Sequence, residues 1–572
     1  MNAHNTKSST IRLVLREMVF PFWTKSEKKA RAWFYLLLTF ALIGASVYCL
    51  VLLNKWNQAF YDALQNLNRA EFFKQLWIFF AVAFSYVLVG VYKFFIIQRL
   101  MLDWREWLTE KNLQQWLSHK SYYFWQLSEN ANDNPDQRLS EDIRELTNLV
   151  LSSGEKIFRE GITFVSFIGI LWAISGSFTF ENIFGYKVEF THYLVWTCLV
   201  YAIVGTWIMH KVGRPLANLN FEQQKFEADF RYSLVRLREN SESVALSHGE
   251  PIEKKNLSSR FSKVIQNFKE IIEKQKQLLF VNNTYSQLAY IFPFVVASPK
   301  LFLKEISLGQ LFQISSAFGQ VQGSVSVFIT LYSDLARLKS VVDRLGGFFE
   351  YMQNAKGTQA QATKNITFTK NAEIEISQLT LKTPDEKLLL KNLSQQIPLG
   401  TRLLIKAPSG YGKSTLIRTL QSMWPYHEGQ ISIPENMRML TIPQKPYLLV
   451  DTLKASLTYP LPAESFSDEQ VSKLLDTCKL SHLKLSLHVE DNWDQKLSPG
   501  EQQRVSFIRV LLQKPDVVFL DEATSAVDEE TQHHLYKLLI ENHPQMTIVS
   551  VAHHESLKEF HSQVLDLTKS SF

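Results

Sequence analysis

Residues 402–415 read RLLIKAPSGYGKST and decide the fold of the last third of the chain. The first five residues form an apolar run of strand length, a glycine-rich stretch follows, and Lys413-Ser414-Thr415 open a helix. Backbone N–H groups of such a loop can surround the β- and γ-phosphates of a nucleotide at a helix N-terminus. The order of strand, loop and helix therefore predicts a phosphate-binding α/β domain.

The side chains of this loop predict a site for ATP with Mg²⁺. Lys413 is expected to reach the phosphates, and the Ser414 hydroxyl is expected to hold Mg²⁺. The loop residues expected to bind the nucleotide are Ser409, Gly410, Tyr411, Gly412, Lys413, Ser414 and Thr415. Ala407 stands where the motif usually has its first glycine, and we expect it to be tolerated if that position does not require a positive φ.

A second apolar strand, residues 517–520, ends in Asp521 and Glu522. The ends of parallel strands present ligands at one edge of a sheet. We expect Asp521 to hold Mg²⁺ through water, and Glu522 to orient and deprotonate the attacking water. An ordinary buried strand that ends in acids is the alternative, but it does not explain the string just upstream.

That upstream string is LSPGEQQR, residues 497–504. Ser498 is predicted to cap a helix that begins at Pro499, with Glu501 as its capping-box partner. A helix N-terminus with free N–H groups and a serine hydroxyl suits a γ-phosphate. Because this helix cannot easily reach the phosphate held by its own chain, we expect Ser498 and Gly500 to contact the ATP of a second copy, and hydrolysis to require a dimer.

The first 333 residues contain six long stretches without a run of charges, which predict six membrane-spanning helices. The predicted spans are residues 33–53, 76–97, 161–178, 193–209, 278–299 and 306–333. A buried core helix is the alternative for any one stretch, but not for six. The first 31 residues carry seven Lys or Arg, whereas loop 54–73 carries two and loop 179–192 carries one. The positive-inside rule therefore places both termini in the cytoplasm.

The segments on the cytoplasmic side have their own patterns. Residues 11–23 mix apolar and basic side chains and are expected to lie along the membrane surface before the first span. The connections 98–159 and 211–277 are long, helical in pattern and charged. We expect them to extend the spans into the cytoplasm and to end in short elements that dock on the ATPase. Solvated helix faces are the alternative.

The sixth stretch is uncharged but rich in glutamine and serine. The residues that fall on one helical face are Gln313, Ser316, Gln320 and Ser324. Polar side chains that face lipid are costly, so this face is expected to line a water-filled cavity and to make the path hydrophilic. Helix packing is the alternative, because Gly319 and Gly323 form a G-x-x-x-G pattern.

Composition excludes several classes of protein. The 572 residues include three scattered cysteines, which argues against a disulfide framework and against a zinc site. No cleavable signal is expected at the N-terminus, because the first apolar run begins near residue 33. The net charge of +6 is modest, and no nucleic-acid partner is expected.

From residue 373 onward the sequence resembles an ABC transporter nucleotide-binding domain. Besides the strings above, the resemblance rests on Gln444 within IPQKPY (442–447), on SAVD (525–528) and on His553 after the apolar run 547–551. It implies that Gln444 senses Mg²⁺ and the attacking water and signals to the membrane domain. It also implies that His553 contacts the γ-phosphate and that Asp528 belongs to the nucleotide site.

A narrower resemblance extends over nearly the whole chain. NPDQRLSEDI (134–143), RLK (337–339) and WP (424–425) are similar to the D subfamily, which includes the peroxisomal fatty-acyl-CoA transporters, and to bacterial SbmA/BacA-type relatives that take up peptides or cobalamin. The departures from the family pattern are Ala407, Pro499 in place of a glycine, His554 in place of an arginine, and Thr383-Pro384 in place of the aromatic that stacks on adenine in many ABC proteins.

The sequence as a whole predicts an ABC half-transporter of exporter-type fold: a membrane α-helical domain of six transmembrane helices and a cytoplasmic α/β P-loop ATPase domain. The expected divisions are an N-terminus with an interfacial helix (1–30), the transmembrane domain (31–345), a linker (346–371) and the nucleotide-binding domain (372–572). Because Glu522, Ser498 and Gly500 are all intact, we expect a homodimer with two equal sites. We expect this homodimer to lie in a bacterial inner membrane.

The expected function is ATP-driven uptake of hydrophilic solutes, such as peptides or a cobalamin-like compound. Two alternatives stay open: export of lipid, acyl-CoA or drug-like molecules, and a membrane regulator that uses ATP but moves no solute.

Overall fold

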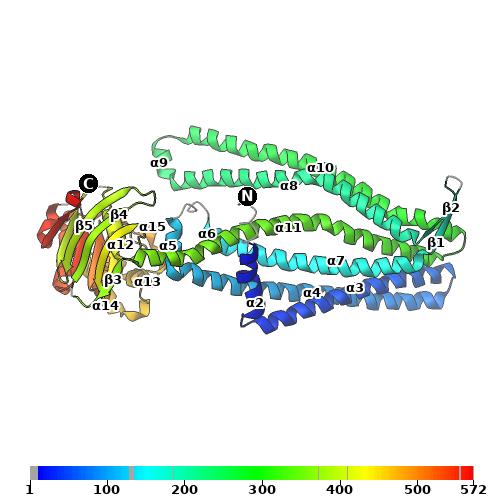
Figure 1. Cartoon of the computed structure of the whole chain (residues 1–572), viewed down its shortest axis with the longest axis horizontal. Coiled ribbons are helices and arrows are strands. Elements are labelled where there is room, and N and C mark those ends of the chain that lie inside the picture. The colour runs from blue at the N-terminus through cyan, green and yellow to red at the C-terminus, as the bar shows by residue number, and fades with distance from the viewer. Residues whose placement is uncertain are drawn as a thin grey trace. The chain divides into compact units, whose positions relative to one another are not determined.

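Figure 1 shows the computed structural model of the chain, which describes residues 11–127, 134–183, 186–371, 373–408, 410–552 and 555–570. The chain folds into two compact units. The first consists of Met1–Gln114 and Asn134–Glu350, and the second of Gln115–Asp133 and Tyr351–Phe572. Each unit has its own hydrophobic core.

Long helices build the first unit, and each of the six predicted spans lies wholly or mostly within one of them. The helices are α3 (Lys29–Gln65), α4 (Arg69–Leu117), α7 (Ile143–Ser175), α8 (Tyr193–Glu239), α10 (Glu250–Phe302) and α11 (Leu308–Thr363). The span predicted at 161–178 extends past Ser175, where its helix ends, and the span predicted at 306–333 begins two residues before Leu308. In the described part of the chain, the helices containing α3, α4, α7 and α8 are long and apolar enough to cross a membrane. The helices α10 and α11 have the length but a more polar sequence, as the glutamines of α11 illustrate.

Shorter elements connect these helices. A two-stranded antiparallel hairpin, β1 (Ser177–Ile183) and β2 (Tyr186–Thr191), joins α7 to α8. The segment predicted to lie along the membrane surface is helical over residues 11–24 and includes a π-helical turn, η1 (Leu15–Val19), before α2 (Phe20–Thr24). Phe22 is fully buried and its ring stacks on Trp104 of α4 at 5.7 Å between centroids. This N-terminal segment is therefore fixed to α4 by aromatic packing.

Helices α8 and α10 run side by side as a long hairpin closed by α9 (Ser241–Leu246), as Figure 1 shows. They pack tightly at Gly205, where an added Cβ would lie 2.0 Å from the ring of Tyr285. The Tyr285 ring also stacks on Tyr201 at 4.8 Å between centroids, and the Tyr201 hydroxyl donates a hydrogen bond to the Tyr285 carbonyl at 2.7 Å. Only glycine leaves room for this contact between the helices.

Two sheets form the framework of the second unit. A parallel sheet has the strand order β13-β6-β12-β11-β8, and a mixed sheet has the order β3-β7-β4-β5. The parallel strands are β6 (Arg402–Lys406), β8 (Met439–Ile442), β11 (Val517–Asp521), β12 (Thr547–Val551) and β13 (Gln563–Asp566). The strands of the mixed sheet are β3 (Ile366–Thr369), β4 (Glu373–Lys382), β5 (Leu388–Pro398) and β7 (His427–Pro434). The strand predictions at 402–406 and 517–520 are confirmed.

Helices of the second unit surround these sheets, and a short pair of strands, β9 (Val450–Thr452) and β10 (Glu490–Asn492), lies apart from them. The α-helices are α5 (Ser121–Gln126), α12 (Lys413–Leu420), α13 (Leu453–Thr458), α14 (Asp468–Thr477), α15 (Trp493–Lys496), α16 (Pro499–Gln513) and α17 (Glu529–Asn542). A 3₁₀ turn, η6 (Glu555–Phe560), precedes β13.

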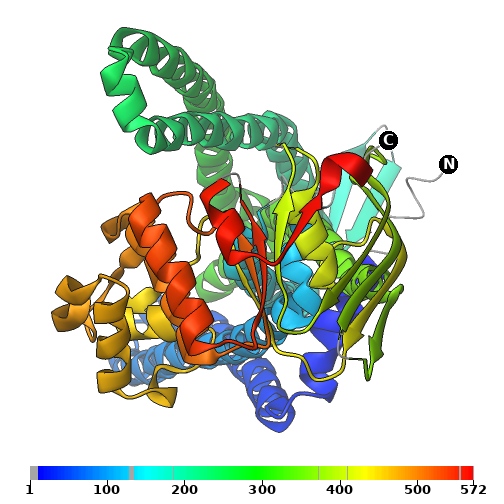
Figure 2. The same cartoon turned by 90° about the vertical axis from the view of Figure 1, so that its left-hand side faces the viewer.

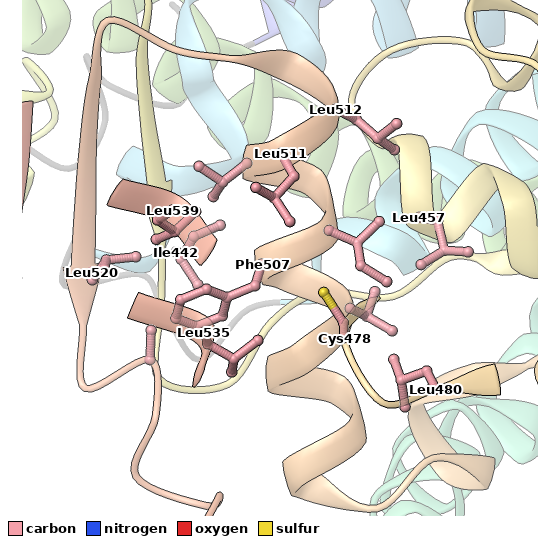
Figure 3. Packing of buried hydrophobic residues seen from close by; sticks show 14 of the residues in the cluster. Ile442, Leu457, Cys478, Leu480, Phe507, Leu511, Leu512, Leu520, Leu535 and Leu539 are labelled. Carbon is pink, nitrogen blue, oxygen red and sulfur yellow. The ribbon is translucent and has the colours of Figure 1, made fainter. Parts of the chain in front are cut away.

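Both faces of the three central parallel strands, β6, β12 and β11, are buried, which explains why these strands are largely apolar. Successive side chains of a strand point to opposite faces. On β11, Val518 and Leu520 join a cluster with Phe507 of α16 and Leu535 of α17, part of which Figure 3 shows from close by. The alternate residue Phe519 joins a second cluster that includes residues of α12, β4 and β5. Figure 2 views this unit with α17, in orange-red, on one side of the parallel strands.

Replacing Gly205 tests the contact between α8 and α10. Gly205→Ala is expected to lower the melting temperature of the purified full-length chain, because the methyl group would displace Tyr285 from its stack on Tyr201. Gly213→Ala is the matched control on the same helix, where the added Cβ would make an ordinary contact 3.6 Å from Leu278. Alanine favours a helix over glycine by about 1 kcal/mol, so the control is expected to be neutral or stabilising. Equal melting temperatures for the two variants would contradict this account.

Candidate functional site

The glycine-rich loop between β6 and α12 has the backbone that its sequence predicts. Gly410 and Gly412 have φ angles of +85° and +79°, a region in which side chains other than glycine are strained. Ala407 does not adopt a positive φ, so the condition under which we expected it to be tolerated is met. Tyr411 and Thr415 are half-buried, in the loop and in the first turn of α12. Ser409 lies outside the described residues.

Lys413, the first residue of α12, is buried with 6% of its surface exposed. Its Nζ donates a hydrogen bond to the Ala407 carbonyl at 2.8 Å and lies 4.0 Å from Oε1 of Glu522. Burial lowers the pKa of Lys413, and the neighbouring Glu522 and Asp521 carboxylates act in the opposite direction. The ammonium group is therefore held between the loop and the acids after β11, within reach of a phosphate bound in the loop.

Asp521 and Glu522 end β11 beside the phosphate loop. The Ser414 hydroxyl hydrogen-bonds the Asp521 carboxylate, and burial raises the pKa of Asp521 against that hydrogen bond. A hydroxyl and a carboxylate are the hard oxygen ligands that Mg²⁺ prefers, so this pair fits the ion. The described residues contain no group of three or more His, Cys, Asp or Glu that could hold a metal.

Glu522 has a strained backbone, which no sequence pattern predicted. Its φ is +51°, which is uncommon for a residue other than glycine. Its backbone N–H donates a hydrogen bond of 3.0 Å to the carbonyl of Val551, the last residue of β12. Such outliers persist where the surrounding structure holds them, and they cluster at functional sites. The direction of the Glu522 side chain therefore depends on the end of β12.

The helix that begins after Ser498 is α16, and the predicted capping box is confirmed. The Ser498 N–H donates to Oε2 of Glu501 at 2.9 Å, and the Glu501 N–H donates to Oγ of Ser498 at 3.4 Å. Pro499 occupies the first helical position, so it replaces a glycine without loss of the helix start. A Cβ on Gly500 would lie 2.8 Å from the carbonyl oxygen of Ala526, so glycine allows loop 525–528 to pack on α16.

Gln503 is a functional candidate that the sequence analysis missed. Its side chain is buried, with 2% exposed. Its Nε2 donates to the Gln444 carbonyl and to Oγ of Ser525, both at 3.1 Å, and its Oε1 accepts from the Ala526 N–H at 2.9 Å. One amide thus joins α16, loop 525–528 and the segment that carries Gln444. These contacts join residues far apart in sequence, so the sequence alone does not reveal them. The one available signal was the position of Gln503 on the buried face of α16.

The remaining predicted site residues have varied surroundings. Gln444 is exposed, and its backbone is held by Gln503. Asp528 caps α17 by accepting a hydrogen bond of 2.8 Å from the Thr531 N–H, which lowers the pKa of its carboxyl group. His553 and His554 lie outside the described residues, directly after the strand that the sequence located at 547–551.

The four polar residues predicted on one face of α11 differ in burial. Gln313 and Ser324 are buried, with 5% and 3% exposed, whereas Ser316 and Gln320 are half-buried. A Cβ on Gly319 or Gly323 would meet no described atom within 4 Å. The G-x-x-x-G face therefore forms no close helix contact within the described chain.

The first long cytoplasmic connection, residues 98–159, contains α5, which belongs to the same unit as the two sheets. The ring of Trp125 packs edge-on against Tyr351, with 4.7 Å between centroids. Lys120, just before α5, donates a hydrogen bond of 3.5 Å to the carbonyl of Gln421, the residue that ends α12. The prediction that this connection docks on the ATPase is confirmed. Its contact is with the helix whose first residue is Lys413.

Comparisons with known proteins match both halves of the chain. The ABC transporter transmembrane region 2 family matches residues 15–302, and the ABC transporter family matches residues 390–525. The inner membrane ABC transporter ATP-binding protein YddA of Escherichia coli is 32% identical over 98% of this chain and 98% of the relative. The lysosomal cobalamin transporter ABCD4 of Homo sapiens is 28% identical over 97% of this chain and 94% of the relative.

A solved structure supports the fold. The structure described as a bacterial Atm1-family ABC exporter with ATP bound superposes with a TM-score of 0.70, at 18% identity, over 96% of this chain and 95% of the other. The chain therefore shares the arrangement of a helical membrane domain followed by an α/β ATPase domain.

Replacing Gln503 tests whether its amide holds the site together. Gln503→Leu is expected to lower the kcat of ATP hydrolysis at least ~10-fold with little change in KM, because the geometry of catalysis rather than phosphate binding is lost. Gln502→Leu is the matched control, since Gln502 lies beside it on α16, is also buried and donates only to the carbonyls of Asp494 and Leu497.

Both substitutions leave buried polar groups without partners and are expected to lower the melting temperature. Only Gln503→Leu is expected to change kcat. Equal kcat values for the two variants would show that Gln503 supports folding alone.

Proposed function

The chain belongs to the ABC transporters, as a half-transporter that couples ATP hydrolysis to transport, and from this premise we propose that two identical copies take up a hydrophilic solute across a bacterial inner membrane. The observation that carries the choice of solute is the half-buried pair Ser316 and Gln320 on α11, which leaves polar surface partly accessible along a predicted span. One named relative, a cobalamin transporter, supports the choice of solute, and another, an inner membrane protein, supports the choice of membrane.

Hydrolysis follows from the residues around the phosphate loop. Lys413 binds the β- and γ-phosphates once ATP displaces its hydrogen bond to the Ala407 carbonyl. Ser414 and Asp521 would hold Mg²⁺, and the bound ion would supply positive charge next to the phosphates. Glu522 orients the attacking water and accepts its proton, and the backbone N–H groups of the loop stabilise the charge of the transferred phosphoryl group.

A second copy completes the site. The partner's Ser498 and the N-terminal N–H groups of its α16 meet the γ-phosphate. His553 and Asp528 complete the contacts around the phosphate and across the dimer. Two equal sites form, because each chain supplies both halves of a site. Both termini of each chain lie in the cytoplasm, as the positive-inside rule predicts.

Coupling to the membrane domain uses α5 and Gln444. Helix α5 is fixed on the ATPase through Trp125, and Lys120 contacts the end of α12. A movement of the phosphate loop on binding ATP is therefore transmitted to α5 and to α4, which precedes it in the chain. Gln503 joins the Gln444 segment to loop 525–528, so both segments move together.

Export of an apolar molecule is the second candidate, and one observation favours it. A groove of about 850 Å³ lies between α8 and α10. Its lining is almost entirely apolar and includes Trp196, Val200, Val204, Leu288, Phe292 and Val295. This surface suits an acyl chain better than a peptide or a corrinoid.

Transport in vesicles separates these candidates. Reconstituted protein is expected to accumulate labelled cobalamin or peptide on the side of the ATPase domain when ATP is present. Glu522→Gln is expected to abolish accumulation while retaining ATP binding. ATP-dependent movement of a labelled phospholipid or acyl-CoA away from the ATPase side would instead support export. Hydrolysis without movement of any of these molecules would contradict transport and support a regulator.

Helix α5 offers a matched pair for the coupling step. Trp125→Ala is expected to abolish transport while ATP hydrolysis continues, because the packing on Tyr351 is lost. Tyr122→Ala on the same helix is the control, since Tyr122 is 47% exposed. Transport and ATPase rates measured in the same vesicles check this. Loss of both activities in Trp125→Ala, or loss of neither, would contradict a coupling role.

A further inference from the structure

A serine interrupts a fully buried strand of the ATPase domain. Strand β12 reads TIVSV and is buried along its whole length. Ser550 is fully buried and pairs in register with Leu520 of β11 and Leu404 of β6, both members of the apolar cluster on one face of the sheet. A hydroxyl in such surroundings is costly unless it is hydrogen-bonded.

Two other buried polar side chains satisfy this hydroxyl. The Tyr536 hydroxyl, on α17, donates to Oγ of Ser550 at 3.0 Å. Nε2 of His561, which follows η6, lies 2.8 Å from the same Oγ. Tyr536 and His561 are 2% and 9% exposed. The three side chains come from three different elements, and none of them was a candidate in the sequence analysis.

The directions of the hydrogen bonds follow from their partners. Nδ1 of His561 lies 2.7 Å from the Leu557 carbonyl, which can only accept, so Nδ1 carries the proton. In the neutral ring Nε2 is then an acceptor, and the Ser550 hydroxyl donates to it while accepting from Tyr536. Within this row of hydrogen bonds, the Tyr536 hydroxyl, the Ser550 hydroxyl and both ring nitrogens of His561 each have a partner. Burial lowers the pKa of His561, which keeps the ring in the neutral form that this arrangement needs.

This row of hydrogen bonds ends at Ser550, one residue before the strand residue that binds the backbone of Glu522. Val551 follows Ser550, and its carbonyl accepts the N–H of Glu522. Val551 also pairs in register with Asp521. A shift of Ser550 would therefore move the carbonyl that fixes the positive φ of Glu522, and with it the carboxylate that faces the attacking water.

We propose that His561 is a positioning residue for ATP hydrolysis, which acts with Ser550 and Tyr536 to hold the end of β12 and thereby the backbone of Glu522. The inference rests on the proposed role of Glu522. It adds a support on the side of the sheet opposite to α12, built from α17 and the segment before β13. A residue that only filled the core would contribute to stability and leave the turnover of the folded protein unchanged.

Steady-state ATPase kinetics of the full-length chain test the proposal. His561→Leu keeps bulk but removes both hydrogen bonds, and it is expected to lower kcat at least ~10-fold with KM for ATP changed less than ~2-fold. His561→Gln can donate through its amide nitrogen and accept through its oxygen, so it is expected to restore most of kcat. Ser550→Ala is expected to match His561→Leu, and the double variant to be no worse than either, because the residues act as one unit.

His427→Leu is the control for a general effect of losing a buried histidine. His427 is 8% exposed in the same unit and hydrogen-bonds the Trp424 carbonyl, away from β12. It is expected to lower the melting temperature and leave kcat unchanged. If His561→Leu does not fold, Tyr536→Phe and Ser550→Ala carry the test, because each removes little more than a hydroxyl.

The outcomes distinguish this inference from the function on which it rests. A wild-type chain whose hydrolysis does not depend on Glu522 contradicts the proposed function. A wild-type chain with Glu522-dependent hydrolysis, together with unchanged kcat in His561→Leu or in Ser550→Ala, overturns the role of His561. A similar loss of kcat in His427→Leu and His561→Leu also overturns it.

Discussion

The parallel pairing of β6, β12 and β11 is the constraint on which the ATPase site depends. The register places Ile405 beside Val551 and Val551 beside Asp521, so the strands end together at the edge where the phosphate loop begins. Both faces of these strands are buried, and slipping one strand by one residue would exchange the residues of its two apolar faces. Lys413, Asp521 and Glu522 are therefore placed by the same packing that stabilises the domain.

The same strands explain why the site has supports on both faces. On one face Lys413 and Ser414 open α12 beside the acids of β11. On the other, Ser550 brings hydrogen bonds into an apolar cluster, and Gln503 joins three segments around α16. The positive φ of Glu522 is held by a carbonyl of β12. The strained backbone of Glu522 is thus held by a strand that is buried along its whole length.

Features that depend on local sequence were predictable, and features that depend on contacts between distant residues were not. The strand before the phosphate loop and the capping box at Ser498 follow from neighbouring residues and are confirmed. The long helices follow from uncharged stretches of the sequence, although α10 and α11 are more polar than the four helices that are apolar enough to cross a membrane by hydropathy alone. Gln503 and His561 could not be found in this way, because each acts through residues more than ten positions away in sequence. Ala407 and Pro499 stand where the family motifs usually have glycine. The local backbone explains why both are accommodated, because Ala407 has no positive φ and Pro499 begins a helix.

The central claim is that each ATP site is shared between two copies, and mixed dimers test it most directly. One variant is Lys413→Ala, which cannot hold the phosphates. The other is Ser498→Asp, which keeps a good helix cap but repels the γ-phosphate. Each variant alone is expected to be inactive. Co-expressed, they form dimers in which an intact phosphate loop of one chain faces an intact Ser498 of the other, so ATP hydrolysis is expected to return. A mixture as inactive as its components would show that the site is completed within one chain and would contradict the account.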